Sequence, residues 1–306
     1  MSNDEISTLA ALSTEGRNPR TMELDTLDTE RILALMNDED ATVAGAVRHA
    51  LPTIARAADL ITAARRTGGR LIYLGAGTSG RIGLLDAVEC PPTFGTAPED
   101  VLGVMAGGTQ AFVRAVEGAE DDPELAAREL DAVGLQAGDV VVGLAASGRT
   151  PYVIGGLRAA RDRGAATISI ACNANAPISA EADIAIEVVT GPEVLTGSTR
   201  LKAGTAQKLV CNMLSTASMV RGGKSYSNLM VDVRPSNAKL VDRAQRIVAE
   251  ATGAARPAAD AALAAASDHA KTAVVMLLAD RDAAEAAALL DQAGGDVRRA
   301  VELAEH

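Results

Sequence analysis

One stretch, Leu71–Arg81, limits the possible folds more than any other part of this sequence. It reads LIYLGAGTSGR, so an apolar run of strand character leads into a glycine-rich turn, and a helical apolar pattern follows. The glycines let the backbone turn without Cβ clashes, while Thr78 and Ser79 put hydroxyl groups at the positive end of the helix dipole. A strand, turn and helix of this kind is typical of a phosphate-binding site.

Two further stretches are also rich in hydroxyl groups. In Val140–Pro151, the sequence Ser-Gly-Arg recurs at Ser147–Arg149 and Thr150 follows it. The turn Thr196–Arg200 precedes a helical pattern of roughly 20 residues, and its Ser198 is either a helix cap or part of an anion pocket. Hydroxyl-rich loops after successive strands favour a sugar phosphate as ligand.

A dinucleotide is the alternative ligand for the first loop, because Leu71–Arg81 also contains the pattern Gly-x-Gly-x-x-Gly. That interpretation requires an acidic residue just after the second strand to bind a ribose hydroxyl. The second expected strand, Val101–Ala106, is followed by Gly107-Gly108 instead. The sequence therefore disfavours a dinucleotide.

The helix after the first loop has a predictable end. Apolar residues recur with helical spacing up to Val88, and Pro91-Pro92 then removes two backbone donors. A proline also disfavours the α region for the residue before it, here Cys90. We expect the helix to end near Cys90, with Glu89 at its end.

Strand and helix patterns alternate between residues 71 and 189, with further strands expected near 101–105, 140–145, 166–172 and 184–189. This alternation predicts an α/β fold with a doubly wound, mainly parallel sheet flanked by helices, and with the glycine loops at its carboxyl edge. Residues 1–28 are polar and are expected to form a loose arm.

After about Lys239 the sequence is alanine-rich and has no strand pattern. Helical patterns near 241–251, 258–266, 272–278 and 283–291 predict a small C-terminal helical bundle, with Gly294-Gly295 closing a helix. We expect three regions: an N-terminal arm with helices at 1–54, the α/β domain at 55–238 and the bundle at 239–306.

Composition excludes several classes of partner. The net charge is −11 and only 2% of residues are aromatic, which argues against nucleic acid and anionic membrane surfaces. The histidines at 49, 269 and 306 lie far apart, so no metal site is expected. Three scattered cysteines and the lack of a signal peptide or membrane span indicate a cytoplasmic protein.

Several blocks together resemble the N-acetylmuramic acid 6-phosphate etherases, which have the sugar isomerase (SIS) fold. The blocks are Thr14–Pro19, Leu74–Arg81, Ala87–Pro92, Ala115–Asp121, Ala145–Tyr152, Thr196–Lys208 and Asn228–Val233. The Glu-Cys-Pro-Pro and Glu-Gly-Ala-Glu-Asp sequences within them are more specific than the glycine loop. The resemblance covers most of the chain in family order.

The resemblance implies cleavage of the lactyl ether of N-acetylmuramic acid 6-phosphate, which yields N-acetylglucosamine 6-phosphate and D-lactate during recycling of cell-wall sugars. It also implies a homodimer, no metal or organic cofactor, and a C-terminal bundle like a ubiquitin-associated (UBA) domain. By motif match, the family carboxylates fall on Glu89 and Glu120. The expected substrate and phosphate ligands are Thr78, Ser79, Gly80, Ser147, Arg149, Thr150 and Ser198.

The residues suit this chemistry. The lactyl oxygen is on C3, β to the C1 aldehyde of the open sugar, so removal of the C2 proton lets lactate leave by elimination, and water then adds at C3. One group takes a proton and another gives one, and two carboxylates can divide these roles. We assign Glu120 as the base at C2 and Glu89 as the acid. The alternative for Glu120 is a solvated surface charge, since Glu117–Asp122 is a run of acidic residues.

Two other functions share these features: a regulatory sugar-phosphate-binding module and an aldose–ketose isomerase. A geometric difficulty also arises, because the ten residues from Ser79 to Glu89 span about 15 Å of helix, which exceeds the length of the sugar. Either the helix breaks at Gly83, or Glu89 reaches the pocket of a second subunit across a two-fold interface. We expect the shared site.

Overall fold

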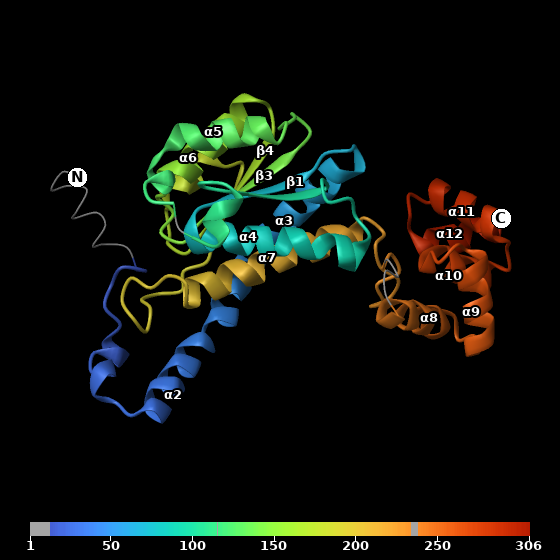
Figure 1. The fold of residues 1–306 in the computed structure, drawn as a ribbon, viewed down its shortest axis with the longest axis horizontal. Helices are drawn as coiled ribbons and strands as arrows, with labels where there is room; N and C mark the ends of the chain where they lie inside the picture. Colours follow the sequence, from blue (N-terminus) through green and yellow to red (C-terminus); the bar gives the residue numbers. More distant parts are fainter. Residues whose placement is uncertain (1–12, 115, 234–237) are drawn as a thin grey trace. The chain divides into compact units, whose positions relative to one another are not determined.

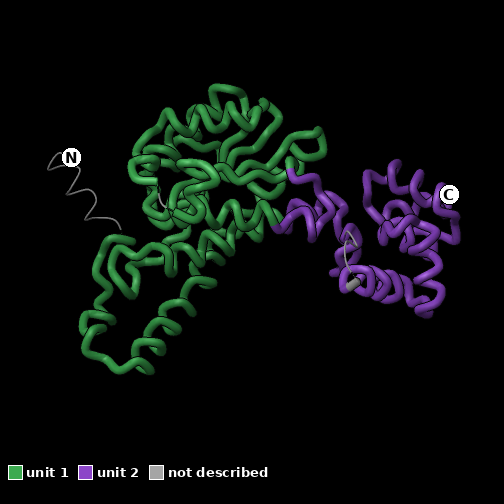
Figure 2. The backbone as a smooth tube through the Cα atoms, viewed as in Figure 1, with its two compact units in different colours: residues 1–88, 99–215 green, residues 89–98, 216–306 purple. Residues whose placement is uncertain are grey.

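The computed structural model describes residues 13–114, 116–233 and 238–306, which divide into two compact units (Figure 2). Unit 1 comprises the described residues up to 88 together with residues 99–215, and unit 2 comprises residues 89–98 and the described residues from 216 onward. The expected domain boundary at 239 falls inside unit 2, and the three-region division stays a prediction.

Among the described residues of unit 1, five strands form one parallel sheet in the order β2-β1-β3-β4-β5 (Figure 1). The strands are β1 (Leu71–Gly75), β2 (Val101–Met105), β3 (Val140–Ala145), β4 (Ala166–Ala171) and β5 (Ile184–Glu187). Every residue of β1 and β3 is buried, as is usual for strands covered on both faces. The predicted α/β fold with a parallel sheet is confirmed.

Helices cover both faces of this sheet. They are α3 (Val43–Arg66), α4 (Gly77–Phe94), α5 (Pro123–Ala132), α6 (Pro151–Asp162) and α7 (Lys202–Arg221), with α2 (Thr29–Asp40) before them. In Figure 1, α5 and α6 lie on one face and α3, α4 and α7 on the other. Strand β1 has β2 on one side and β3 on the other, so the strand order changes direction between β1 and β3. Open α/β sheets bind ligands at the carboxyl ends of the strands at such a switch point.

Helix α4 corrects the expected end near Cys90, because it continues through Pro91 and Pro92 to Phe94. A proline lacks a donor but keeps its carbonyl, and the Pro91 carbonyl accepts the Gly95 N–H at 3.0 Å. The missing donors therefore weaken only the last turn. The helix also has no break at Gly83, so the first of the two explanations for the position of Glu89 is wrong.

The segment after residue 12 corrects the expected loose arm. It contains the 3₁₀ turns η1 (Pro19–Thr21) and η2 (Leu24–Thr26), and Thr14 is fully buried. The Thr21 hydroxyl donates to the Val194 carbonyl at 2.9 Å. This bond joins residues far apart in sequence, so the polar composition of the segment does not reveal it. Residues 1–12 of the expected arm lie outside the described residues.

Unit 2 contains a helical bundle with its own core. Its helices are α8 (Ala238–Thr252), α9 (Arg256–Ala265), α10 (Ala270–Ala279), α11 (Ala283–Gln292) and α12 (Val297–Ala304). Val248, Leu263, Val274 and Leu290 are among the buried residues that fill the core. The helical C-terminal region is confirmed, but α12 was not predicted. It has only eight residues, and Asp296 caps it by accepting the Arg299 N–H.

No single helix among the described residues is long and apolar enough to span a membrane; α9 and α10 meet the length and composition test only as a pair, bent by 116°.

Candidate functional site

The first glycine loop begins directly at the carboxyl end of β1. A Cβ at Gly80 would lie 2.6 Å from the Gly75 carbonyl oxygen, so this tight turn requires glycine. Ser79 is buried, and its hydroxyl donates to Gln207 Oε1 of α7 at 2.9 Å, while Thr78 is half-buried. Ser79 thus joins the loop to α7, which the sequence did not predict.

The loop after β3 is more open. Ser147, Arg149 and Thr150 are all half-buried. The Arg149 N–H donates to Ser147 Oγ at 3.3 Å, and Thr150 precedes α6 without making a side-chain cap. The Thr150 hydroxyl therefore has no capping role, which leaves it available to a ligand.

Asn173, after β4, anchors this loop to the segment after residue 12. Its side-chain amide is buried and donates to Thr14 Oγ1 at 2.9 Å and to the Ala146 and Ser147 carbonyls at 3.2 and 3.4 Å. Its oxygen accepts from Ser13 Oγ at 2.8 Å. Sequence reasoning missed Asn173, because a single asparagine after a strand is not distinctive.

The third loop differs from the other two, because the N-terminus of α7 is already occupied. The fully buried Glu193 carboxylate accepts the Lys202 and Ala203 N–H groups at 2.9 and 3.0 Å. The Lys202 ammonium is buried against Glu39 at 2.6 Å. Burial alone raises the pKa of Glu39, but Lys202 lowers it below its ordinary value overall.

Ser198 lies in this third loop and is half-buried, and its backbone N–H donates to the Leu195 carbonyl at 3.0 Å. Because a protein carboxylate takes the N-terminal donors of α7, the helix end is not an open anion site. A ligand at this loop would have to bind groups of the loop itself, such as the Ser198 side chain.

Glu120 lies beside the first glycine loop. It belongs to the 3₁₀ turn η4 (Ala119–Asp121) and is exposed. A cavity of about 250 Å³ is lined by Gly77 and Arg81 on one side and by Glu117 and Glu120 on the other. Its lining residues all belong to unit 1. The structure therefore brings a predicted carboxylate to a predicted phosphate loop.

Arg81 lines this cavity and binds the loop that follows β2. Its guanidinium donates to the Phe112 and Ala111 carbonyls, both at 2.9 Å, so it holds the loop that leads to Glu120. Sequence reasoning noted Arg81 only as the counterpart of Arg149. That correspondence was the available signal, since both arginines follow a Ser-Gly pair at the start of a helix.

Glu89 is exposed on α4 and belongs to unit 2. One turn before it on the same helix, Leu85 is 47% exposed, and the adjacent Val88 is 56% exposed. Leu85 and Val88 therefore give this exposed part of α4 a small apolar surface next to Glu89. Glu89 is not among the residues that line the Glu120 cavity.

The described residues contain no group of three or more His, Cys, Asp or Glu side chains arranged to hold a metal ion. The three cysteines are buried and form no disulfide with one another. Burial and the charge of Glu193 raise the pKa of Cys172 to about 12, and burial and Asp86 raise that of Cys211. These two thiols stay protonated at neutral pH and do not act as nucleophiles.

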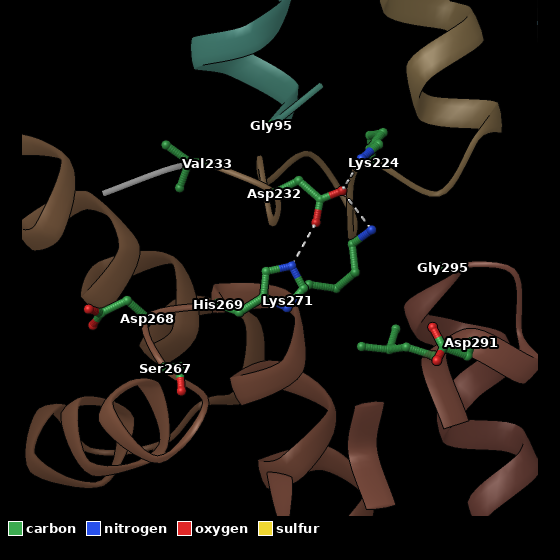
Figure 3. A pocket seen from close by; sticks show the side chains of 11 residues that line it. Gly95, Lys224, Asp232, Val233, Ser267, Asp268, His269, Lys271, Asp291 and Gly295 are labelled. Atoms are coloured by element: carbon green, nitrogen blue, oxygen red, sulfur yellow. Dashed lines mark ion pairs between the residues drawn. The ribbon is translucent and has the colours of Figure 1, made fainter. Parts of the chain in front are cut away.

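A separate cavity of about 490 Å³ lies within unit 2 (Figure 3). The Asp232 carboxylate there pairs with Lys271 at 2.7 Å, with Lys224 at 3.0 Å and with His269 at 3.5 Å. Burial raises the pKa of Asp232, but its hydrogen bonds and cationic neighbours lower it to about 2 overall. Because Oδ2 pairs with both lysines and Oδ1 lies near the His269 ring, this cluster joins Asp232 to the bundle rather than forming a second site.

Comparison with known proteins agrees with this fold. Residues 53–161 match the glucokinase regulatory protein N-terminal SIS domain, and residues 118–217 match the SIS domain. Among solved structures, phosphoheptose isomerase GmhA from Neisseria gonorrhoeae covers 62% of this chain and 97% of its own at 20% identity. Its TM-score of 0.48 is too low to support an argument about function.

Curated relatives are much more similar. The N-acetylmuramic acid 6-phosphate etherase of Mycolicibacterium smegmatis is 69% identical over 96% of this chain and 98% of its own length. The protein of the same name from Serratia proteamaculans is 58% identical over 96% and 99%. Identity at this level over nearly the full length of both proteins shows that the chain belongs to the N-acetylmuramic acid 6-phosphate etherase family.

Proposed function

We propose that this protein cleaves the D-lactyl ether of N-acetylmuramic acid 6-phosphate to give N-acetylglucosamine 6-phosphate and D-lactate. The observation that carries the proposal is the cavity that Glu120 lines together with Gly77 and Arg81 of the first glycine loop. A phosphate loop and a carboxylate at one cavity are what proton removal from a phosphorylated sugar requires. The names of the relatives at 58–69% identity supply the substrate.

In the proposed mechanism, Ser147, Thr150 and the N–H groups of the glycine loops bind the 6-phosphate, with Ser79 completing the first loop. Glu120 takes the C2 proton from the open-chain sugar. The electron pair of that bond is first held as the enolate of the C1 aldehyde. The enolate then forms a C2=C3 double bond as the C3–O bond breaks, and Glu89 gives its proton to the departing lactyl oxygen. Water then adds across the double bond, with its hydroxyl on C3 and its hydrogen on C2.

We further propose that the active site is shared within a homodimer. Helix α4 is continuous from Gly77 to Phe94, so Glu89 follows Ser79 by about 15 Å along the axis, beyond the reach of a hexose bound at Ser79. The exposed Leu85 and Val88 give the adjacent helix face an apolar character that suits a two-fold contact. Glu89 would then act in the partner's site.

A cytoplasmic location is part of the proposal, and the buried cysteines, which form no disulfide with one another, support it. The substrate suggests a role in recycling cell-wall sugars.

Lactate release tests the proposed function. Purified protein should release one equivalent of D-lactate from N-acetylmuramic acid 6-phosphate, and Glu120→Gln should abolish this. An isomerase would convert an aldose phosphate that has a C2 hydroxyl group to the ketose and would release no lactate. A sensor would bind the sugar phosphate and leave it unchanged, and either result would contradict the proposal.

A further inference from the structure

We propose that Glu129 is a positioning residue that holds the loop carrying Glu120 in register with the substrate loop after β3. The inference rests on the proposed function, because the roles of Glu120 and Ser147 come from it. Glu129 lies on α5 and does not line the Glu120 cavity, so it acts through the groups that it binds.

Three donors converge on the Glu129 carboxylate. It accepts the hydroxyl of Tyr152, and it also interacts with the backbone N–H groups of Gly107 and Gly108, of which the Gly108 N–H donates to the Met105 carbonyl at 2.8 Å as well. Tyr152 is fully buried in the first turn of α6, directly after Thr150 and Pro151. Burial and the Glu129 charge raise the pKa of Tyr152, so the phenol remains the donor. One carboxylate therefore joins the start of α6 to the turn that follows β2.

The turn after β2 places two consecutive N–H groups beside this carboxylate. Gly107 and Gly108 have φ values of +84° and +72°, and consecutive N–H groups in a turn form a concave site for an anion. From this turn the chain continues to η4, which carries Glu120 and packs against α6. Arg81 holds the same loop further along, at Ala111 and Phe112. Glu129 thus fixes the start of the loop and Arg81 its middle.

Contact between the helices themselves does not require Glu129. A Cβ at Gly155 of α6 would lie 2.1 Å from the Pro123 carbonyl oxygen of α5, so the two backbones meet directly. Glu129 adds a polar link from this helix pair to the Gly107-Gly108 turn. Replacing it should therefore displace the loop while leaving the helix pair folded.

Two substitutions test this role. Glu129→Gln keeps the side-chain shape but weakens the acceptor, and Tyr152→Phe removes only the hydroxyl. Because the phosphate loop is intact, we expect Glu129→Gln to lower kcat for lactate release by about tenfold or more while KM changes less than about threefold. Tyr152→Phe should lower kcat by a smaller factor. Asp131→Asn is the matched control, since Asp131 lies on the same helix but pairs with Arg163.

Amide hydrogen exchange gives a readout independent of activity. In Glu129→Gln, the amides of residues 105–112 should exchange about tenfold faster or more, while α6 keeps its protection and the control matches the wild type. A folded Glu129→Gln protein with unchanged kcat and exchange overturns the proposal, as does a raised KM with unchanged kcat. If the wild type releases no lactate, the proposed function fails, whereas the exchange rates still decide whether Glu129 holds the loop.

Discussion

Gly83 of α4 lies so close to Tyr73 of β1 that a Cβ at residue 83 would stand 2.7 Å from the Tyr73 Cβ. One turn further along, Asp86 accepts the Tyr73 hydroxyl at 2.8 Å. The glycine therefore permits close packing of a continuous helix instead of marking a break. The proposal of a shared site rests on this continuity of α4.

The Gly83 contact predicts that one added methyl group at this position destabilises the protein. Gly83→Ala should lower the free energy of unfolding by about 1–3 kcal/mol, because the new Cβ meets the first side-chain atoms of a fully buried tyrosine. Urea unfolding measures this. Gly45→Ala on α3 is the matched control, since nothing lies within 4 Å of its Cβ position, and it should stabilise by up to about 1 kcal/mol. Equal effects of the two substitutions would contradict the packing argument.

Substitutions in the two phosphate loops should affect substrate affinity and protein stability differently. Ser147→Ala should raise KM by about ten- to a hundredfold, the loss of a charge-assisted hydrogen bond, without lowering the melting temperature. Ser79→Ala should raise KM and also lower the melting temperature, because Gln207 is fully buried and loses its hydroxyl donor. Steady-state kinetics and thermal melts of both variants test this, and an unchanged KM in the double variant would refute the phosphate assignment.

Isotope exchange should distinguish the proposed roles of Glu89 and Glu120. With Glu89→Ala, the C2 hydrogen should still exchange with deuterated solvent, because the base remains, but no lactate should appear. Glu120→Gln should lose both reactions. Mass spectrometry of recovered substrate measures the exchange. Loss of exchange in Glu89→Ala means that the roles are reversed or combined.

Subunit mixing tests the shared site. Glu89→Ala subunits mixed with Ser79→Ala/Ser147→Ala subunits should regain activity, because each heterodimer then has one site with neither defect. Native mass spectrometry confirms that heterodimers form, and lactate assays before and after exchange measure the recovery. Heterodimers without recovered activity show that Glu89 acts within its own chain.

The Asp232 cluster predicts acid sensitivity of unit 2. The pKa of Asp232 is about 2, below its ordinary 3.8, so its stabilisation is present above pH 3.8 and is lost as the pH falls through 2. Asp232→Asn leaves Lys271 buried without its counter-charge and should cost about 3–5 kcal/mol. Asp242→Asn removes exposed ion pairs, which solvent screens, and should have a much smaller effect. Denaturant unfolding of both at neutral pH tests the difference.

Local patterns predicted much of the fold. The apolar runs before the glycine loops identified β1 and β3, because a buried parallel strand requires such a run and a tight turn requires glycine. The Glu193 cap of α7 and the role of Asn173 depend on contacts between distant segments, which leave no periodic signal. That Thr150 makes no side-chain cap to α6 is likewise known only from the structure.

The bond between Thr14 and Asn173 has a practical consequence for protein engineering. Asn173 also holds the Ser147 carbonyl, so a proteolytic cut or a bulky fusion close to Thr14 disturbs a substrate loop through one side chain. Kinetic constants measured with a tag attached close to Thr14 can therefore include an effect of the tag. Helix α12 belongs to the separately cored bundle, and a purification tag placed after it is remote in sequence from these loops.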